Sequence, residues 1–187
     1  VQGDTPRIAY SSIKKDGEIV KSYLRDNGVT DDEMVLSSVS ISPTYTSQYD
    51  EEGRYLGDIQ SGYELTQSMT VTSQDIDKVE LISRDISNLI ESGVELQSNL
   101  PEYYYTKLDE LKLDLITKAT ANAKERIDLV ASGCGAQTDQ LLTASLGVFQ
   151  ITATNSGTES YSYGGSFNTS SRFKTANITV RLNYSVK

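Results

Sequence analysis

The chain has 187 residues, of which 37% are hydrophobic and 23% charged, a composition typical of a globular protein with enough length for one core or two small ones. Its 26 acidic residues outnumber its 17 basic ones, and the formal net charge is −9. Phosphate binding requires concentrated Lys and Arg, so this charge argues against a nucleic-acid partner and disfavours anionic membrane surfaces.

The first half of the chain reads as a helix followed by strands. Residues 8–27 place Ala9, Ile13, Val20 and Leu24 on one face. Asn27-Gly28 ends this helix because Gly adopts the left-handed conformation readily. Alternation over residues 35–42 predicts a strand that stops near Pro43. Residues 46–60 are polar and read as a hairpin connection or loop.

A second helix follows a second strand. Residues 63–72 alternate between apolar and polar, which predicts a strand with one buried face. Ser73 or Asp75 can cap the helix that comes next, and Gly93 closes it. The strings 27–29 (NGV) and 92–94 (SGV) suggest two related helix-then-strand units.

Residues 93–133 predict a strand, a cap, a long helix and a stop. The strand runs from Val94 into the three tyrosines at 103–105, and Thr106 is expected to begin the helix. Gly133 and Gly135 end it. The helix carries a single apolar stripe: Leu108, Leu111, Leu115, Ala119, Ala123, Ile127 and Val130.

The last part of the chain predicts two strands with a polar connection between them. Residues 146–154 and 176–186 alternate, whereas 155–172 are rich in Gly and Ser and read as a loop. Because most strands alternate, we expect an α+β fold with a largely antiparallel sheet, three helices packed on one face and βαβ-like repeated units. Residues 1–187 are predicted to form a single domain.

The ordered set of local strings resembles the SIMPL-domain family of bacterial envelope proteins. The resemblance covers about residues 8–187. It rests on Gly62-Tyr63 opening a strand, SQDIDKV at 73–79, Gly93-Val94 leaving a helix and KATANAK at 118–124. The tyrosine triplet is similar to a Bacteroidetes-like branch of the family.

The resemblance implies a periplasmic or cell-envelope location, with no cofactor and no catalytic residues to transfer. It also implies a strand before the first helix, but residues 1–7 are short and polar, so this strand is expected to be missing. The chain starts without an initiator Met, which leaves room for a signal peptide or an N-terminal membrane anchor outside it.

The residue types exclude the commonest catalytic chemistry. The chain has no His, which removes Ser-His and Cys-His catalysis and His-ligated zinc. Cys134 follows a helix end whose partial negative charge disfavours a thiolate. The acids at 31–33 and 50–52 lack the spacing of a calcium loop and read as solvated turns. We therefore predict no catalytic, cofactor or metal site and no enzymatic activity.

Tyrosine is the most informative side chain for function. The chain has 12 Tyr and no Trp, and Tyr combines a large apolar ring with a hydrogen-bonding tip that suits interfaces. Tyr103, Tyr105, Tyr161 and Tyr163 form the candidate interaction surface. In a strand at least one ring of the triplet would be core, whereas the Tyr161 loop is the better exposed candidate.

Three functions remain open at the level of sequence. The leading hypothesis is a non-enzymatic cell-envelope protein that acts by protein contacts, as a homo-oligomer or with an envelope partner, through sheet edges or Tyr-bearing loops. The alternative is a periplasmic binding module for a saccharide or small polar ligand. An enzyme that uses only carboxylates ranks last, because two acids would have to converge in a cleft.

Overall fold

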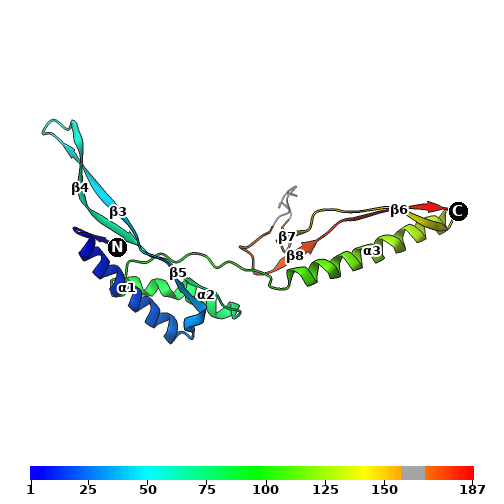
Figure 1. Cartoon of the computed structure of the whole chain (residues 1–187), viewed down its shortest axis with the longest axis horizontal. Coiled ribbons are helices and arrows are strands. Elements are labelled where there is room, and N and C mark those ends of the chain that lie inside the picture. Colours follow the sequence, from blue (N-terminus) through cyan, green and yellow to red (C-terminus); the bar gives the residue numbers. More distant parts are fainter. Residues whose placement is uncertain (157–166) are drawn as a thin grey trace. The chain divides into compact units, whose positions relative to one another are not determined.

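A computed structural model of the chain describes residues 1–156 and 167–187 (Figure 1). The chain divides into two compact units, Val1–Pro101 and Glu102–Lys187. Each unit has its own sheets, and each is described by itself. The expectation of a single domain over residues 1–187 stays a prediction.

The first unit contains two helices and two antiparallel sheets. A three-stranded sheet has the order β1-β4-β3, and a two-stranded sheet joins β2 to β5. The elements in chain order are β1 (Gln2–Gly3), α1 (Pro6–Asp26), the 3₁₀ turn η1 (Asp31–Glu33), β2 (Met34–Leu36), β3 (Ser40–Tyr49), β4 (Tyr55–Thr66), β5 (Met69–Val71), α2 (Ile76–Asp85) and η2 (Ile86–Ser92).

The core of this unit consists of two clusters along α1. Near the start of α1, Ala9 and Ile13 pack against Leu65 of β4. Near its end, Leu24 packs with Val29 and with Ile82 of α2. The apolar stripe predicted for the first helix is therefore confirmed at Ala9, Ile13 and Leu24, which are all buried.

The two predicted helix stops have the same geometry. Gly28 and Gly93 both adopt positive φ, at 79° and 83°. The amide of the following valine then bonds a carbonyl five residues back, from Val29 to Leu24 at 3.0 Å and from Val94 to Leu89 at 3.2 Å. Both valines are buried, which completes the hydrophobic contact of this C-terminal motif.

The β3–β4 hairpin is longer than the sequence predicts. β3 does not stop at Pro43 but continues to Tyr49, and β4 begins at Tyr55, so most of the stretch read as a loop is paired strand. β3 is an edge strand of its sheet. An edge strand tolerates Pro because its missing N–H can lie on the unpaired side.

A short strand precedes α1, although the sequence predicts none. Gln2 and Gly3 pair with Glu64 and Tyr63 of β4. Two glycines permit the close approach: a Cβ on Gly62 would lie 2.8 Å from the carbonyl oxygen of Gly3, and a Cβ on Gly3 would lie 2.8 Å from the amide nitrogen of Ala9. Backbone pairing, rather than side-chain pattern, forms this strand.

The second unit packs one long helix on a two-stranded sheet. β6 pairs with β9 and β7 with β8, both antiparallel. α3 lies chiefly over β9 and contacts β6 much less. The elements are α3 (Leu108–Gly133), β6 (Thr138–Leu146), β7 (Gln150–Ala153), β8 (Lys174–Asn177) and β9 (Val180–Val186).

The stripe predicted on α3 is confirmed except at its last position. Its first six members are partly buried. Val130 is exposed instead, and Ala131 is the buried residue at this end of the helix. The helix begins at Leu108 rather than Thr106, and its N-cap Lys107 makes no side-chain capping bond.

The predicted strand over residues 93–105 is wrong, since no regular element is found there. Its residues have high strand propensity, but no strand within residues 1–156 and 167–187 pairs with them, and propensity alone does not form a strand. The closing strand is divided into β8 and β9. The α+β class with three helices and antiparallel pairing is confirmed, and the described strands form four sheets rather than one.

Candidate functional site

The tyrosine triplet lies where the second unit begins. Tyr103 is partly buried, and its amide donates to the carbonyl of Thr169 at 2.8 Å. Tyr104 and Tyr105 are more than half exposed. The Tyr104 hydroxyl donates to Glu102, and this hydrogen bond raises the pKa of the Tyr104 phenol. Tyr103 and Tyr105 therefore differ in environment, with Tyr105 the more accessible.

Two other predicted residues, Tyr161 and Tyr163, lie outside the described residues. Their assignment to an interaction surface stays a prediction.

The β3–β4 hairpin carries an aromatic face that the sequence reading missed. Alternate residues of a strand share a face, and so do direct cross-strand partners. Tyr45 and Tyr49 lie on the face of β3 that also holds Ile41, and the Tyr49 and Tyr55 rings meet edge to face at 5.9 Å. All three tyrosines are more than half exposed. The sequence pattern predicted a loop over residues 46–60, so this alternation was not recognised as that of a strand.

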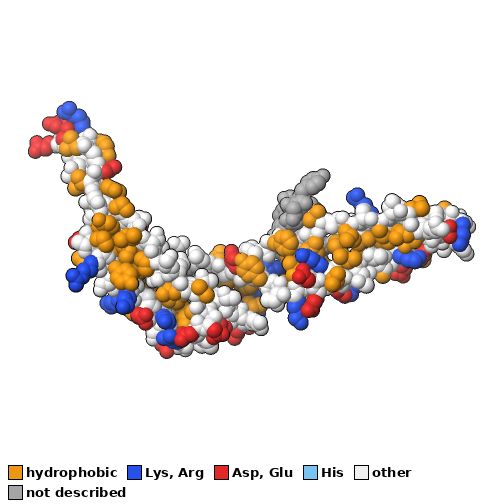
Figure 2. Space-filling model, viewed as in Figure 1, with side chains coloured by type: hydrophobic (Ala, Val, Ile, Leu, Met, Phe, Trp, Pro, Cys, Tyr) orange, Lys and Arg blue, Asp and Glu red, His pale blue; other side chains and the backbone are white. Residues whose placement is uncertain are grey.

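A second apolar surface lies on β6. Leu141 and Leu146 are opposite Tyr184 and Val180 of β9, so they lie on the sheet face that α3 covers. Because α3 lies chiefly over β9, these two leucines stay 51% and 58% exposed. In Figure 2 the hydrophobic side chains form a band along the part of the chain that carries α3 and these strands.

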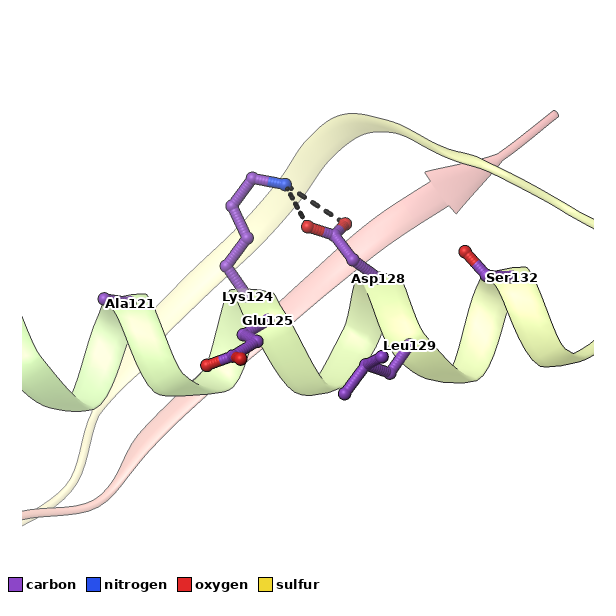
Figure 3. Close-up of a pocket in the computed structure, with 6 residues that line it drawn as sticks. All are labelled: Ala121, Lys124, Glu125, Asp128, Leu129 and Ser132. Carbon is purple, nitrogen blue, oxygen red and sulfur yellow. Dashed lines mark hydrogen bonds and ion pairs between the residues drawn. The ribbon is translucent and has the colours of Figure 1, made fainter.

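A shallow groove of about 460 Å³ runs along one flank of α3 (Figure 3). Lys124 and Asp128 point to the same side of the helix there and form an ion pair at 2.9 Å. Asp128 also accepts a hydrogen bond from the Thr138 hydroxyl of β6 at 2.5 Å. The remaining lining residues are Ala121, Glu125, Leu129 and Ser132.

The two charged groups in this groove, Lys124 and Asp128, stabilise each other's charged forms and are not arranged for proton transfer. The Thr138 hydrogen bond, followed by that from Lys124, lowers the pKa of Asp128. The Asp128 carboxylate in turn raises the pKa of Lys124. Both groups are therefore held in their charged forms at neutral pH, which suits a structural contact between α3 and β6 better than acid–base catalysis.

The opposite flank of α3 carries a groove of about 390 Å³ with an apolar lining. Val130 and Ile127 of the helix face Val186 of β9 across it, and Cys134 borders it. The Cys134 thiol is exposed. Neither groove is lined by Tyr103 or Tyr105.

The acidic run at 31–33 has a structural role. Glu33 forms an ion pair with Lys78 at 2.9 Å, in which both side chains are less than one-fifth exposed, and Lys78 also donates to the Gly28 carbonyl. Hydrogen bonds from Ser73, Lys78 and the Thr30 backbone lower the pKa of Glu33 to about 2. Among residues 1–156 and 167–187, no group of three or more His, Cys, Asp or Glu could hold a metal ion.

These observations define a two-unit α+β protein whose described residues offer exposed apolar surfaces rather than a deep polar cleft. The family model of SIMPL, described as a protein of unknown function (DUF541), matches residues 1–186, and the chain belongs to this family. No curated protein matches the chain. In the described part of the chain, none of the helices has the length and apolar character needed to cross a membrane.

Proposed function

We propose that the chain is a non-enzymatic cell-envelope protein that acts by associating with further copies of itself. The observation that carries this proposal is the imbalance between buried and exposed apolar side chains. In the described residues of the second unit, only Ala131 and Ile151 are buried hydrophobic residues. A unit of this size gains too little from so small a core, so further apolar surface has to be covered by a partner.

The exposed surfaces suit protein contacts. The Tyr45, Tyr49 and Tyr55 face of the hairpin offers rigid aromatic rings, and Tyr is enriched in the buried centres of interfaces. The outer edges of β3 and β6 are unpaired within the described chain, and such edges can accept another strand. The cell-envelope location rests on the family resemblance of the sequence.

The alternative of a saccharide-binding module is less well supported. It requires a pocket built around exposed tyrosines, such as Tyr103 or Tyr161. The two grooves on α3 are shallow and lie elsewhere, and the exposed Tyr45 and Tyr49 are on a strand face. A surface of this kind favours a protein partner over a small ligand.

Light scattering coupled to size exclusion, at physiological salt and over a range of concentrations, tests self-association directly. The expected result is a mass that is a multiple of 20.6 kDa. A strict monomer at high concentration would refute the proposal. Fractionation of the source cells tests the location, and recovery of the protein from the cytosol alone would contradict it.

A further inference from the structure

The aromatic face of the β3–β4 hairpin also carries a carboxylate. On that face of β3, Ser47 lies between Tyr45 and Tyr49. The cross-strand partner of Ser47 is Asp58, so the Asp58 carboxylate lies among the tyrosines. Asp58 accepts from the Ser47 hydroxyl at 2.7 Å and is hydrogen-bonded to Tyr55. A carboxylate has about four acceptor positions, so Asp58 can still accept from a cation.

The hairpin as a whole is strongly acidic. Its one basic residue, Arg54, is paired at the tip with Asp50 at 3.5 Å and with Glu52 at 3.8 Å. Acidic side chains gather at this tip in Figure 2. The acidic residues from Ser40 to Thr66 are Asp50, Glu51, Glu52, Asp58 and Glu64. Cations pair with carboxylates and lie over aromatic rings, so this surface fits a partner that presents Lys or Arg.

The first half of α1 presents such cations within the same unit. Arg7 and Lys14 are seven residues apart and therefore share a face of the helix. Ile8 and Lys15 form a second pair of this kind beside them, and all four residues are exposed. Residues 6–15 contain no acidic residue. In the described part of the chain, the three cations form no ion pair. We call these four residues the basic patch.

The basic patch does not stabilise its own helix. Arg7 lies in the first turn of α1, and this turn holds no acidic residue. The partial positive charge of a helix N-terminus favours acidic side chains and disfavours cations. A contact with an external acidic surface therefore explains the position of Arg7 better than helix stability does.

We propose, on the basis of the self-association argued above, that the hairpin of one copy docks on the basic patch of a second copy. The tyrosine rings would cover Ile8 and the aliphatic stems of the cations, and the hairpin carboxylates would pair with the charged ends. The contact joins two different surfaces. It is therefore head-to-tail, so that each copy uses its hairpin on one neighbour and its basic patch on another.

The charges on the two surfaces have matching spacings. Arg7 and Lys14 are separated by about 10 Å along the helix axis, at about 1.5 Å a residue. On the hairpin, Ser47 stands opposite Asp58 and is three residues from Asp50, which is about 10 Å along a strand. A hairpin laid along α1 can therefore place Asp58 near one cation and the acidic tip near the other.

Charge complementarity favours a second copy as the occupant. Copies with a net charge of −9 repel each other in most orientations, and two hairpins would bring like charges together. Docking of the hairpin on the basic patch brings opposite charges together instead. An anionic membrane would attract the basic patch but repel the rest of the acidic chain.

The variant Lys14→Glu tests the basic patch. Lys14 is an exposed helix residue, so Glu is tolerated there, but in the proposed contact it would face the hairpin carboxylates. We expect the dissociation constant from light scattering to rise at least about tenfold. Arg84→Glu is the matched control, because Arg84 is an exposed cation on α2 of the same unit and its reversal changes the net charge equally. Its dissociation constant should stay close to that of the wild type.

Charge exchange identifies the surface that Lys14 meets. Asp58→Lys alone should also weaken association. The double variant Lys14→Glu/Asp58→Lys should restore association, because opposite charges would again face each other across the contact. A double variant that associates no more tightly than Lys14→Glu alone would overturn docking of the hairpin on the basic patch.

The salt dependence of the wild type is a second measurement that needs no variant. Raising the salt from about 0.1 M to about 1 M shortens the screening length from about 10 Å to about 3 Å. The head-to-tail contact should weaken over this range, whereas an interface held by apolar burial alone should not. An oligomer whose mass does not fall with salt would contradict the contact.

The outcomes separate this inference from the proposed function. An oligomeric wild type that Lys14→Glu weakens and Arg84→Glu does not supports the head-to-tail contact. An oligomer that survives Lys14→Glu, or that both variants weaken equally, overturns this contact and leaves self-association intact. Binding to phosphatidylglycerol vesicles that Lys14→Glu abolishes, with the mass in solution unchanged, assigns the basic patch to a membrane and also overturns the contact. A monomeric wild type overturns both proposals.

Discussion

Replacing Leu65 by Ala tests the packing of α1 on the β4 strand. Leu65 is 2% exposed and packs against Ala9 and Ile13. Removing a fully buried leucine side chain costs about 2–5 kcal/mol, since the transfer free energy is lost and a cavity remains. The partly buried Val39 and Tyr63 line the same cluster and can relax into the space, so we expect a cost of about 3 kcal/mol.

Urea unfolding, followed by circular dichroism at one fixed protein concentration, measures this loss. The concentration is fixed because association with other copies adds to the apparent stability. Leu56→Ala is the control, because Leu56 is a largely exposed residue of the same strand and should change the free energy of unfolding by less than about 0.5 kcal/mol. A cost for Leu65→Ala below about 1 kcal/mol would refute the packing of α1 against β4.

The other predictions concern one ion pair and one close backbone contact. Hydrogen bonds from Ser73, then Lys78 and the Thr30 backbone, lower the pKa of Glu33 from 4.5 to about 2, so these contacts stabilise the fold above pH 4.5 and their contribution is lost as the pH falls toward 2. Glu33→Gln should therefore lower the melting temperature at pH 7, and its difference in melting temperature from the wild type should be smaller at pH 3. A difference in melting temperature that does not depend on pH would contradict this prediction. Gly62→Ala should destabilise the first unit by about 1–3 kcal/mol, because the new Cβ would meet the Gly3 carbonyl oxygen at 2.8 Å. Gly133→Ala, whose Cβ meets nothing within 4 Å, should be neutral or stabilising in the same thermal scan.

The helices and their ends follow from local sequence. Gly28 ends α1 as predicted. Gly93 ends the 3₁₀ segment η2, which continues from α2 after Asp85, and Asp75 caps α2 by accepting from the amide of Lys78 at 3.1 Å. These contacts join residues three to five apart. A helix closes its hydrogen bonds within four residues along the chain, so a short window of sequence contains both the apolar stripe and the stop.

The candidate surfaces were only partly accessible to sequence. Tyr105 was found because three consecutive tyrosines are conspicuous, but Tyr45, Tyr49 and Tyr55 were spread over a stretch that reads as polar loop. Their common face exists only because β3 pairs with β4. The exposure of Leu146 likewise depends on α3 lying over β9 rather than β6. The alternation of residues along β6 does not predict which of the two strands the helix covers.

What the sequence determined by itself was the α+β class, the three helices and the absence of histidine chemistry. Only the tertiary structure decided which extended segments became strands. Gln2 and Gly3 form a strand although their sequence has little strand pattern, whereas residues 93–105 form none although their sequence has a strong strand pattern. The physical reason is that a strand is completed by a ladder to a segment distant along the chain. Gly3 pairs with Tyr63 of β4, whereas among the described residues no strand forms a ladder with the run before α3, in which Tyr103 makes one backbone bond to Thr169.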